Sequence, residues 1–260
     1  MASGSQDLGT GYNNATTESL GLISGATGGS PQGIYEESST QEYPIGTKRE
    51  FEDGRVFRYA LAGAAVAAGD LVSQDVSATA VVELQNKATA AAVGATEVIL
   101  TDSSALGAAT ANQYAGGYLH TVDDAGEGFT YRIKSNTAAS SNAVTFTLYD
   151  GLVVAVTTAT DTIVTGNVYN KVVPAIATTD VIVAGVAARA FTSGYYGWVQ
   201  TKGVATVRVD AAIAIGILLM LSDANAGQAE TYDLSHPPIG TALIAQDTAD
   251  GSVSVMLNIS

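Results

Sequence analysis

Residues 194–209 have the sequence Gly194-Tyr195-Tyr196-Gly197-Trp198-Val199-Gln200-Thr201-Lys202-Gly203-Val204-Ala205-Thr206-Val207-Arg208-Val209. Apolar or β-branched residues alternate here with polar ones, which is the period of a strand with one buried face and one solvated face. The stretch also holds the single tryptophan of the chain. Lys202-Gly203 is either a two-residue hairpin loop or a glycine bulge that bends one long strand. In both cases the neighbouring β-rich segments need such a sheet to pack on.

The composition favours short strands and tight turns over long helices, so we predict a mainly β fold. Of the 260 residues, 47% are apolar, mostly Ala and Val, and 28 are glycine, which is typical of β structure with many turns. This length accommodates one large β domain or two smaller ones. The chain has no Cys, which excludes disulfides, thiolate catalysis and Cys-ligated metals.

The net charge of −14 argues against a nucleic-acid partner, because affinity for DNA comes mainly from Lys and Arg that neutralise phosphates. No basic segment followed by an apolar one opens the chain, so we expect no secretory signal. The longest apolar run, residues 211–221, is shorter than the roughly 20 residues that span a bilayer. We therefore expect a soluble protein that binds neither nucleic acid nor membrane.

Residues 1–45 differ from the rest of the chain. They are rich in Gly, Ser, Thr, Asn and Gln and contain no Lys or Arg. Their apolar residues are isolated and follow no helical or strand period; the candidate anchors are Tyr12, Leu20, Leu22, Ile23, Ile34, Tyr35 and Tyr43. Such a segment buries too little apolar surface to offset its ordering entropy, about 1–2 kcal/mol per residue. We predict an extended N-terminal arm laid across neighbouring subunits; the alternative is an arm folded back on its own body.

Residues 48–59 predict a β-hairpin closed by Asp53-Gly54, with Phe51 facing Val56 across the turn. Four of the 11 basic residues of the chain lie in this segment, namely Lys48, Arg49, Arg55 and Arg58. They form either a solvated strand face with cross-strand ion pairs or a basic patch that docks on an acidic partner. We include them with the arm anchors as candidate partner-binding residues.

The remaining chain predicts a body and an inserted module. Residues 46–94 and 181–260 are assigned to a β-barrel or β-tulip-like body, and residues 95–180 to an inserted β-sandwich-like module. Within these ranges, residues 76–92 fit either a short helix or a strand with an Ala-rich loop. Three glycines with similar aliphatic flanks, Gly69, Gly166 and Gly216, are expected to make equivalent corners. Pro237-Pro238 marks a loop, because proline does not fit a central strand.

No arrangement of residues predicts catalysis. His120 and His236 have no second His at metal-ligand spacing, so we expect no zinc. A Gly-x-Ser-x-Gly elbow, which would place a nucleophilic serine, is absent. The glycine-rich residues 25–33 lack the Gly-Lys-Ser/Thr of a phosphate loop. We therefore expect no enzyme and no cofactor.

Two further groups of residues allow a binding role. Asp123, Asp124 and Glu127 cluster in a turn and could hold a cation, but the twelve-residue calcium-loop pattern is absent, and a solvated turn is the preferred interpretation. Trp198 with Tyr195 and Tyr196 could form a platform on which a sugar stacks. Packing within the sheet is the preferred role for these aromatic residues.

A set of packing motifs runs through residues 55–72 and 185–257. They are Arg55-Val56-Phe57-Arg58-Tyr59 leading into Ala67-Ala68-Gly69-Asp70-Leu71-Val72, Gly185-Val186-Ala187, residues 194–200 with Gly203-Val204-Ala205, Gly216-Ile217-Leu218-Leu219 and Ile239-Gly240-Thr241-Ala242-Leu243. Together they resemble the capsid decoration, or head cement, proteins of tailed phages. The resemblance implies a β-barrel or β-tulip-like body on the outer capsid face, bound where subunits of the major capsid protein meet.

The expected function is therefore structural. A clamp that bridges capsid subunits resists the outward push of packaged DNA, and an acidic protein suits the capsid exterior better than the DNA-facing lumen. The expected partners are the major capsid protein and neighbouring copies of this chain, for instance in a trimer, and the expected location is the outer surface of a virion assembled in the host cytoplasm. The alternative is a phage fibre or adhesin whose residues 95–180 bind a host glycan or receptor. A third hypothesis is an enzyme that acts on polysaccharide, for which the sequence contains no identifiable carboxylate pair.

Overall fold

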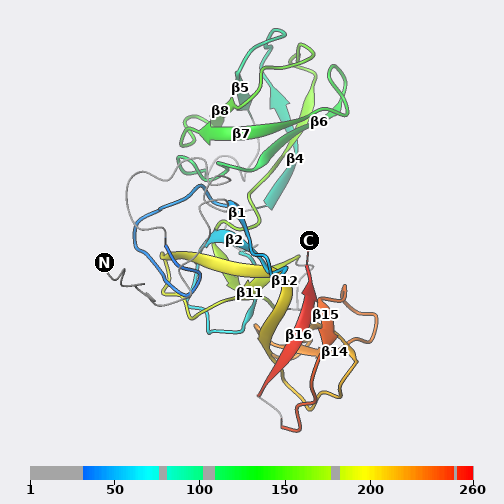
Figure 1. Ribbon diagram of the computed structural model, residues 1–260. Coiled ribbons are helices and arrows are strands. Elements are labelled where there is room, and N and C mark those ends of the chain that lie inside the picture. The colour runs from blue at the N-terminus through cyan, green and yellow to red at the C-terminus, as the bar shows by residue number, and fades with distance from the viewer. Residues whose placement is uncertain (1–31, 76–80, 102–108, 177–181, 249–250, 260) are drawn as a thin grey trace, which may run out of the picture.

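The computed structural model is built from β-strands that form two sheets (Figure 1), which confirms the mainly β fold. It describes residues 32–75, 81–101, 109–176, 182–248 and 251–259. The strands are β1 (Lys48–Glu50), β2 (Val56–Leu61), β3 (Leu71–Gln74), β4 (Val81–Ala88), β5 (Glu97–Thr101), β6 (Tyr118–Asp123), β7 (Thr130–Asn136), β8 (Ala143–Leu148), β9 (Asp161–Thr165), β10 (Val172–Pro174), β11 (Val183–Ala187), β12 (Tyr196–Arg208), β13 (Leu218–Leu221), β14 (Ala229–Thr231), β15 (Gly240–Ala242) and β16 (Ser252–Asn258).

The first sheet is the body and follows the order β10-β3-β11-β12-β16-β15-β13-β14, with the β1–β2 hairpin attached to β12 through β2. Strand β12 belongs to both halves of this sheet. Its first half pairs with β2 and β11, and its second half pairs with β16. In Figure 1 it accordingly runs from the middle of the molecule towards the C-terminal strands drawn in orange and red. The stretch from which the sequence analysis started is thus the shared strand of the body.

Strand β12 is continuous, so the glycine bulge is confirmed and the hairpin alternative at Lys202-Gly203 is wrong. Its register with β2 shifts between Gln200 and Lys202, and Gly203 has a φ of +85°. A residue other than glycine rarely adopts that conformation. The bulge lets one strand leave β2 and continue along β16, because a bulge bends the strand that carries it.

The second sheet is a closed barrel in the order β4-β5-β8-β7-β6-β9. Its side chains enclose a separate apolar core that includes Leu119, Ile133 and Phe146, each with no exposed surface. The inserted module is therefore a barrel and not a sandwich. Its strands extend from β4 to β9, whereas β10 returns to the body and pairs with β3. This differs from the expected ranges at both ends, because the Ala-rich residues around β4 carry no decisive period and form a strand.

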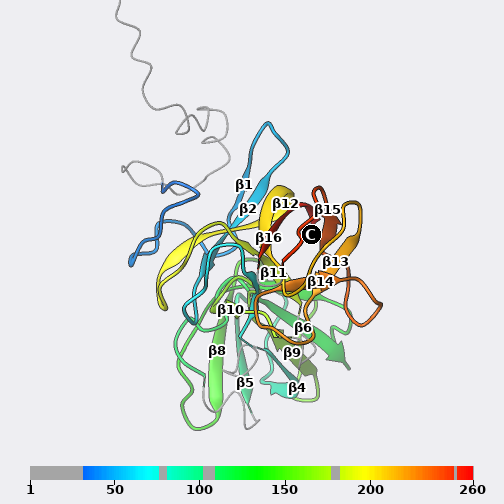
Figure 2. The same ribbon diagram turned by 90° about the horizontal axis from the view of Figure 1, so that it is seen from below.

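The barrel and the C-terminal strands lie at opposite ends of the molecule in Figure 1, with β2, β11 and part of β12 between them. Figure 2 shows that the β1–β2 hairpin projects from this middle region. Strand alternation explains the core of the C-terminal end, since β16 buries Val253, Val255 and Leu257 and turns the residues between them outward.

The predicted hairpin at residues 48–59 is confirmed, but its predicted register is wrong by one residue. Glu50 lies opposite Val56, and the Phe51 amide donates to the Arg55 carbonyl at 3.0 Å. Phe51 therefore faces Arg55, and the loop has three residues. The difference comes from Gly54, which has a φ of +83°. A glycine with positive φ at the last loop position is typical of a three-residue hairpin loop, here residues 52–54.

Two of the three predicted corners are equivalent. Gly69 and Gly216 have φ values of +81° and +79°, and each lies three residues after an isolated bridge. Gly94 repeats the geometry in the barrel, with a φ of +83° three residues after the bridge at Ala91. Gly166 has no positive φ, so its assignment as an equivalent corner was wrong. Its aliphatic flanks belong to β9 and the coil that follows.

Candidate interaction surface

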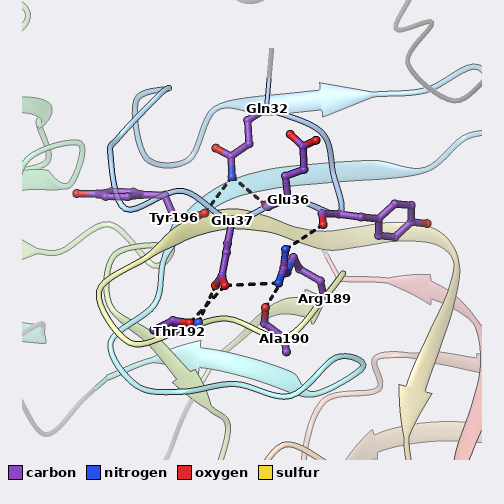
Figure 3. Close-up of polar contacts among 8 residues, drawn as sticks. Gln32, Glu36, Glu37, Arg189, Ala190, Thr192 and Tyr196 are labelled. Atoms are coloured by element: carbon purple, nitrogen blue, oxygen red, sulfur yellow. Dashed lines mark hydrogen bonds and ion pairs between the residues drawn. The ribbon is translucent and has the colours of Figure 1, made fainter. Parts of the chain in front are cut away.

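The described part of the N-terminal arm begins at Gln32 and lies on the body of its own chain. The buried Gln32 amide nitrogen Nε2 donates to the carbonyl oxygens of Glu36 at 2.8 Å and Tyr196 at 3.0 Å (Figure 3). Its Oε1 accepts from the Tyr59 hydroxyl at 2.8 Å, and its backbone carbonyl accepts from Arg49 Nη1 at 3.0 Å. Because a buried amide is costly to leave unpaired, these contacts hold the chain at this point.

A second set of contacts, separate from those of Gln32, holds the arm on the body through Glu37. The Glu37 carboxylate accepts from the Thr192 amide at 2.8 Å and from Arg189 Nη2 at 3.4 Å (Figure 3). Arg189 Nη1 also donates to the Tyr35 carbonyl at 3.2 Å. An ionised acceptor strengthens such hydrogen bonds. We call this contact, formed by Glu37, Arg189 and Thr192, the Glu37 clasp.

Aromatic packing also holds the arm on the body. Tyr43 is 3% exposed, and its ring centroid lies 5.3 Å from that of Tyr59 and 5.4 Å from that of Trp198. Burial raises the pKa of Tyr59 to about 12, because the apolar surroundings disfavour the phenolate. Trp198 is fully buried, so packing within the sheet is confirmed as its role and the sugar-platform alternative is wrong.

The predicted arm anchors therefore divide into groups. Tyr43 and Ile34 pack against the body, so residues 32–45 fold back on their own chain. Tyr35 is 59% exposed and its hydroxyl lies 3.5 Å from Arg55 Nη1. The remaining anchors, Tyr12, Leu20, Leu22 and Ile23, lie outside the described residues.

The four basic residues of the hairpin do not form one patch. Lys48 and Arg49 are neighbours in β1 and therefore point to opposite faces. Lys48 is exposed and pairs with Glu50 at 2.6 Å. Arg49 is 7% exposed, and its guanidinium lies 5.6 Å from the centre of the Trp198 ring. Burial lowers the pKa of Arg49, while its Nη1 donates to the Gln32 carbonyl at 3.0 Å.

The other two basic residues have local partners of different kinds. Arg55 pairs with Asp53 at 2.6 Å within the turn, so the ion pairs of the hairpin are local and do not cross between the strands. Arg58 donates to the Gly46 carbonyl at 3.2 Å and lies 5.9 Å from the centre of the Tyr169 ring. Only Arg58 points towards a hollow between the body and the barrel.

The body carries an exposed apolar row that the sequence analysis missed. Val204 lies opposite Met256, Met256 opposite Thr241, and Thr241 opposite Leu218, across β12, β16, β15 and β13. The three apolar side chains are 45–47% exposed. Further exposed apolar residues follow nearby in the chain, namely Ile215, Leu243 and Ile244. We call Val204, Met256, Thr241 and Leu218 the apolar row.

The strands that carry the apolar row contain no Asp or Glu, although the chain has 25 such residues. A partly apolar surface without carboxylates is easier to desolvate than one that carries them, although Lys202 and Arg208 of β12 share its outward face. One signal in the sequence did point to it. In residues 252–258 the outward positions are Ser252, Ser254, Met256 and Asn258, and Met256 alone breaks the polar series.

Three carboxylates that the sequence did not single out lie close together near the C-terminal strands. Asp223, Glu230 and Asp233 bring one carboxylate oxygen each to within 4.8 Å of one another, and such oxygens suit a hard cation. His236 Nε2 lies 3.0 Å from Asp223. Burial, with the neighbouring carboxylates adding to it, raises the pKa of Glu230. These side chains are exposed or half-buried on an acidic surface, so we assign no ion to them.

The other polar candidates have structural partners. Asp123 is the last residue of β6 and Asp124 follows it in the predicted turn, where the Asp123 carboxylate accepts from the Asp124 amide at 2.8 Å. The His120 ring nitrogens lie 3.1 Å from the Thr130 hydroxyl and 3.0 Å from that of Thr165. Burial lowers the pKa of His120. These contacts explain the positions of the residues without a ligand.

No family model, curated protein or solved structure matches this chain. Among the described residues, no helix has the length and apolar character needed to cross a membrane.

Proposed function

We propose that the protein is a viral structural protein that binds the outer face of a phage capsid and bridges subunits of the major capsid protein. In this role it stabilises the head against the pressure of the packaged DNA. The apolar row on four carboxylate-free strands of an otherwise acidic chain is the observation that carries the proposal. The sequence resemblance to capsid decoration proteins supports it independently.

The physical case starts from burial. Covering apolar surface contributes about 25 cal/mol per Å², and a standard interface buries about 800 Å² on each partner. The apolar row extends across β12, β16, β15 and β13, so it is broad enough to form the centre of such an interface. The acidic remainder of the surface is then left facing outward, away from the DNA.

The N-terminal arm would provide a second contact with the capsid, in addition to the apolar row. The Gln32 contacts and the Glu37 clasp fix the described arm on the body, so the anchors before Gln32 start from a fixed point on each molecule. We propose that they contact neighbouring capsid subunits or neighbouring copies of this chain. Linked weak contacts bind more tightly together than separately, because the second forms at high effective concentration.

A capsid-binding experiment tests the apolar row. Purified protein is mixed with undecorated capsids, and occupancy is measured by cryo-electron microscopy for Met256→Asp and for the control Ile99→Asp. Ile99 is a 40% exposed apolar residue on the barrel strand β5, so the control adds the same charge elsewhere. We expect Met256→Asp to lower occupancy at least about tenfold, since an unpaired carboxylate buried at an interface is costly. Equal occupancy of the two variants would rule out the row as the contact.

The adhesin alternative has one observation in its favour. Val93 and Val153 are 65% and 61% exposed and lie in adjacent loops, which the Gly94 amide and the Leu152 carbonyl join at 2.7 Å. These loops lie at the end of the barrel where β4 ends and β9 begins. Cell binding by the full-length protein that is lost in Val93→Asp and retained in Met256→Asp would favour this function over the capsid role.

A further inference from the structure

Two arginines from different parts of the fold line one hollow. Arg58 comes from β2 of the body and Arg132 from β7 of the barrel, and both border a hollow of about 540 Å³ between the two. Each guanidinium lies over a tyrosine ring, Arg58 at 5.9 Å from the Tyr169 centroid and Arg132 at 5.0 Å from that of Tyr149. Stacking holds a guanidinium in place while its N–H groups stay available to an acceptor.

These two arginines differ from the other four in the chain. Three of the others pair with carboxylates, Arg55 with Asp53, Arg189 with Glu37 and Arg208 with Asp70. The fourth, Arg49, is buried against a carbonyl and aromatic rings. Among the described residues, Arg58 and Arg132 have no carboxylate partner. In a chain with 25 acidic and 11 basic residues, the two arginines that are at least partly exposed and have no carboxylate partner thus border the same space.

The positive lining continues into a neighbouring hollow of about 310 Å³. Both hollows are bordered by Ile45, Gly116 and Arg132. The second one adds Lys134, which follows Arg132 on the same outward face of β7, and the side chains of Gln41, Asn112 and Asn170. Neither hollow is lined by an Asp or Glu. We call the two hollows together the arginine groove.

The walls of the groove are tied together by hydrogen bonds. Asn167 Nδ2 donates to the Ile45 carbonyl at 3.0 Å, and Asn170 Nδ2 donates to the Gln113 carbonyl at 3.1 Å. Asn167 is 8% exposed, so its contact is a buried link between the arm and the coil after β9. A site with walls held in this way loses little conformational freedom when a ligand binds.

We propose that the arginine groove binds an extended acidic segment of a partner protein, with carboxylates on Arg58 and Arg132. A guanidinium matches a carboxylate with paired hydrogen bonds, and clusters of arginine are a recurrent way to recognise acidic motifs. A peptide fits better than a sugar, because one face of Tyr149 and one of Tyr169 are already covered by guanidinium groups. This inference concerns a different surface from the proposed function and stands or falls separately.

The test uses the full-length protein and two labelled peptides, one of alternating Glu and Ser and one of alternating Gln and Ser. Fluorescence anisotropy measures their affinity for the protein and for Arg132→Gln, Lys134→Gln and Lys202→Gln. Arg132 and Lys134 are exposed, so their loss should leave the fold intact. Lys202 is an exposed residue of β12 outside the groove, and its variant removes the same charge.

We expect the Glu peptide to bind and the Gln peptide to bind at least about tenfold more weakly. Arg132→Gln should weaken binding of the Glu peptide about tenfold or more, because the free energy of a hydrogen bond to a charged group corresponds to at least that change in affinity. Lys134→Gln should weaken binding of the Glu peptide less than Arg132→Gln does. Lys202→Gln should weaken it by less than about twofold, because an exposed charge outside the groove contributes little to affinity. Added salt should weaken binding, since the groove is open to solvent.

Three results would overturn the inference. Equal affinity for the two peptides would show that carboxylates are not recognised. Equal effects of Arg132→Gln and Lys202→Gln would show that only net charge matters. Tighter binding of an oligogalacturonate, tested in the same assay and lost in Arg132→Gln, would assign the groove to an acidic glycan instead of a peptide.

Discussion

The Cα atom of Arg55 lies 2.9 Å from the position that a Cβ atom would occupy at Gly203. The β1–β2 hairpin therefore approaches β12 at the bulge so closely that only glycine fits there. Gly203 also has a φ of +85°, which is unfavourable for any L-residue with a side chain. We predict that Gly203→Ala lowers the free energy of unfolding by about 3 kcal/mol or more, because strain and a backbone clash combine. Urea denaturation measures the loss.

Gly194→Ala is the matched control for this prediction. Gly194 has nearly the same φ, +82°, but no atom lies within 4 Å of its added Cβ. It should lose only the conformational part, about 1–2 kcal/mol. A loss at Gly203 no larger than the loss at Gly194 would mean that the hairpin moves away freely and that the close approach does not stabilise the sheet.

Tyr59 predicts a pH dependence of stability at high pH. Burial raises its pKa to about 12, whereas an unfolded tyrosine titrates near 10. The neutral phenol therefore stabilises the fold fully below about pH 10, and this contribution is lost as the pH rises from about 10 to 12. We expect the free energy of unfolding to fall over that window by at most about 2–3 kcal/mol, measured by denaturation at a series of pH values.

Tyr59→Phe separates this effect from general alkaline unfolding. The variant loses the hydrogen bond to Gln32 at 2.8 Å, so it should be less stable at pH 7 by about 1–2 kcal/mol. Its stability should then decline less steeply between pH 10 and 12. A decline as steep as that of the unmodified protein would assign the titration to other groups, for example Tyr43 or Tyr169, whose pKa values are also raised.

The Glu37 clasp predicts where the arm opens. Glu37→Gln keeps the shape of the side chain but removes the charge that Arg189 and the Thr192 amide contact. We expect amide exchange in residues 32–43 to accelerate about tenfold, since the loss of a charge-assisted contact is worth about 1.4 kcal/mol or more. Hydrogen-exchange mass spectrometry of the full chain measures it. Glu42→Gln, at an exposed position in the same segment, should leave the exchange unchanged, and equal acceleration in both variants would contradict the clasp.

Strand alternation made the β elements of the body predictable. Strands β12 and β16 lie where the apolar period of residues 194–209 and 252–257 predicts them. The predicted alternation of a buried and a solvated face holds in β16 and from Thr201 onward in β12, whereas residues 197–201 are buried on both faces. The hairpin register was not predictable in the same way, because it depends on the conformation of Gly54 and not on the flanking pattern. The start of the barrel was missed because alanines around β4 fit a helix, a strand or a loop.

The surfaces were harder to predict than the strands. The apolar row exists because Val204, Met256 and Leu218 share a register across strands that are distant in the sequence. Arg58 and Arg132 likewise meet only after the barrel is folded against the body. Arg58 is a neighbour of Lys48, Arg49 and Arg55 in the sequence, but strand alternation and local ion pairs separate the four side chains in the fold.

The separate cores predict that the barrel and the body unfold as distinct units. Phe146 is fully buried in a cluster formed only by residues of the barrel and its corners, and Leu219 is fully buried in a body cluster. We predict that Phe146→Ala, a change that costs about 3–5 kcal/mol, accelerates amide exchange in β5–β8 and leaves β12–β16 unchanged. Leu219→Ala, at about 2–5 kcal/mol, should do the reverse. If either variant accelerates exchange equally in both regions, the two sheets form a single cooperative unit, and the hydrogen bonds of Asn167 and Asn170 across the groove couple them more strongly than their separate cores suggest.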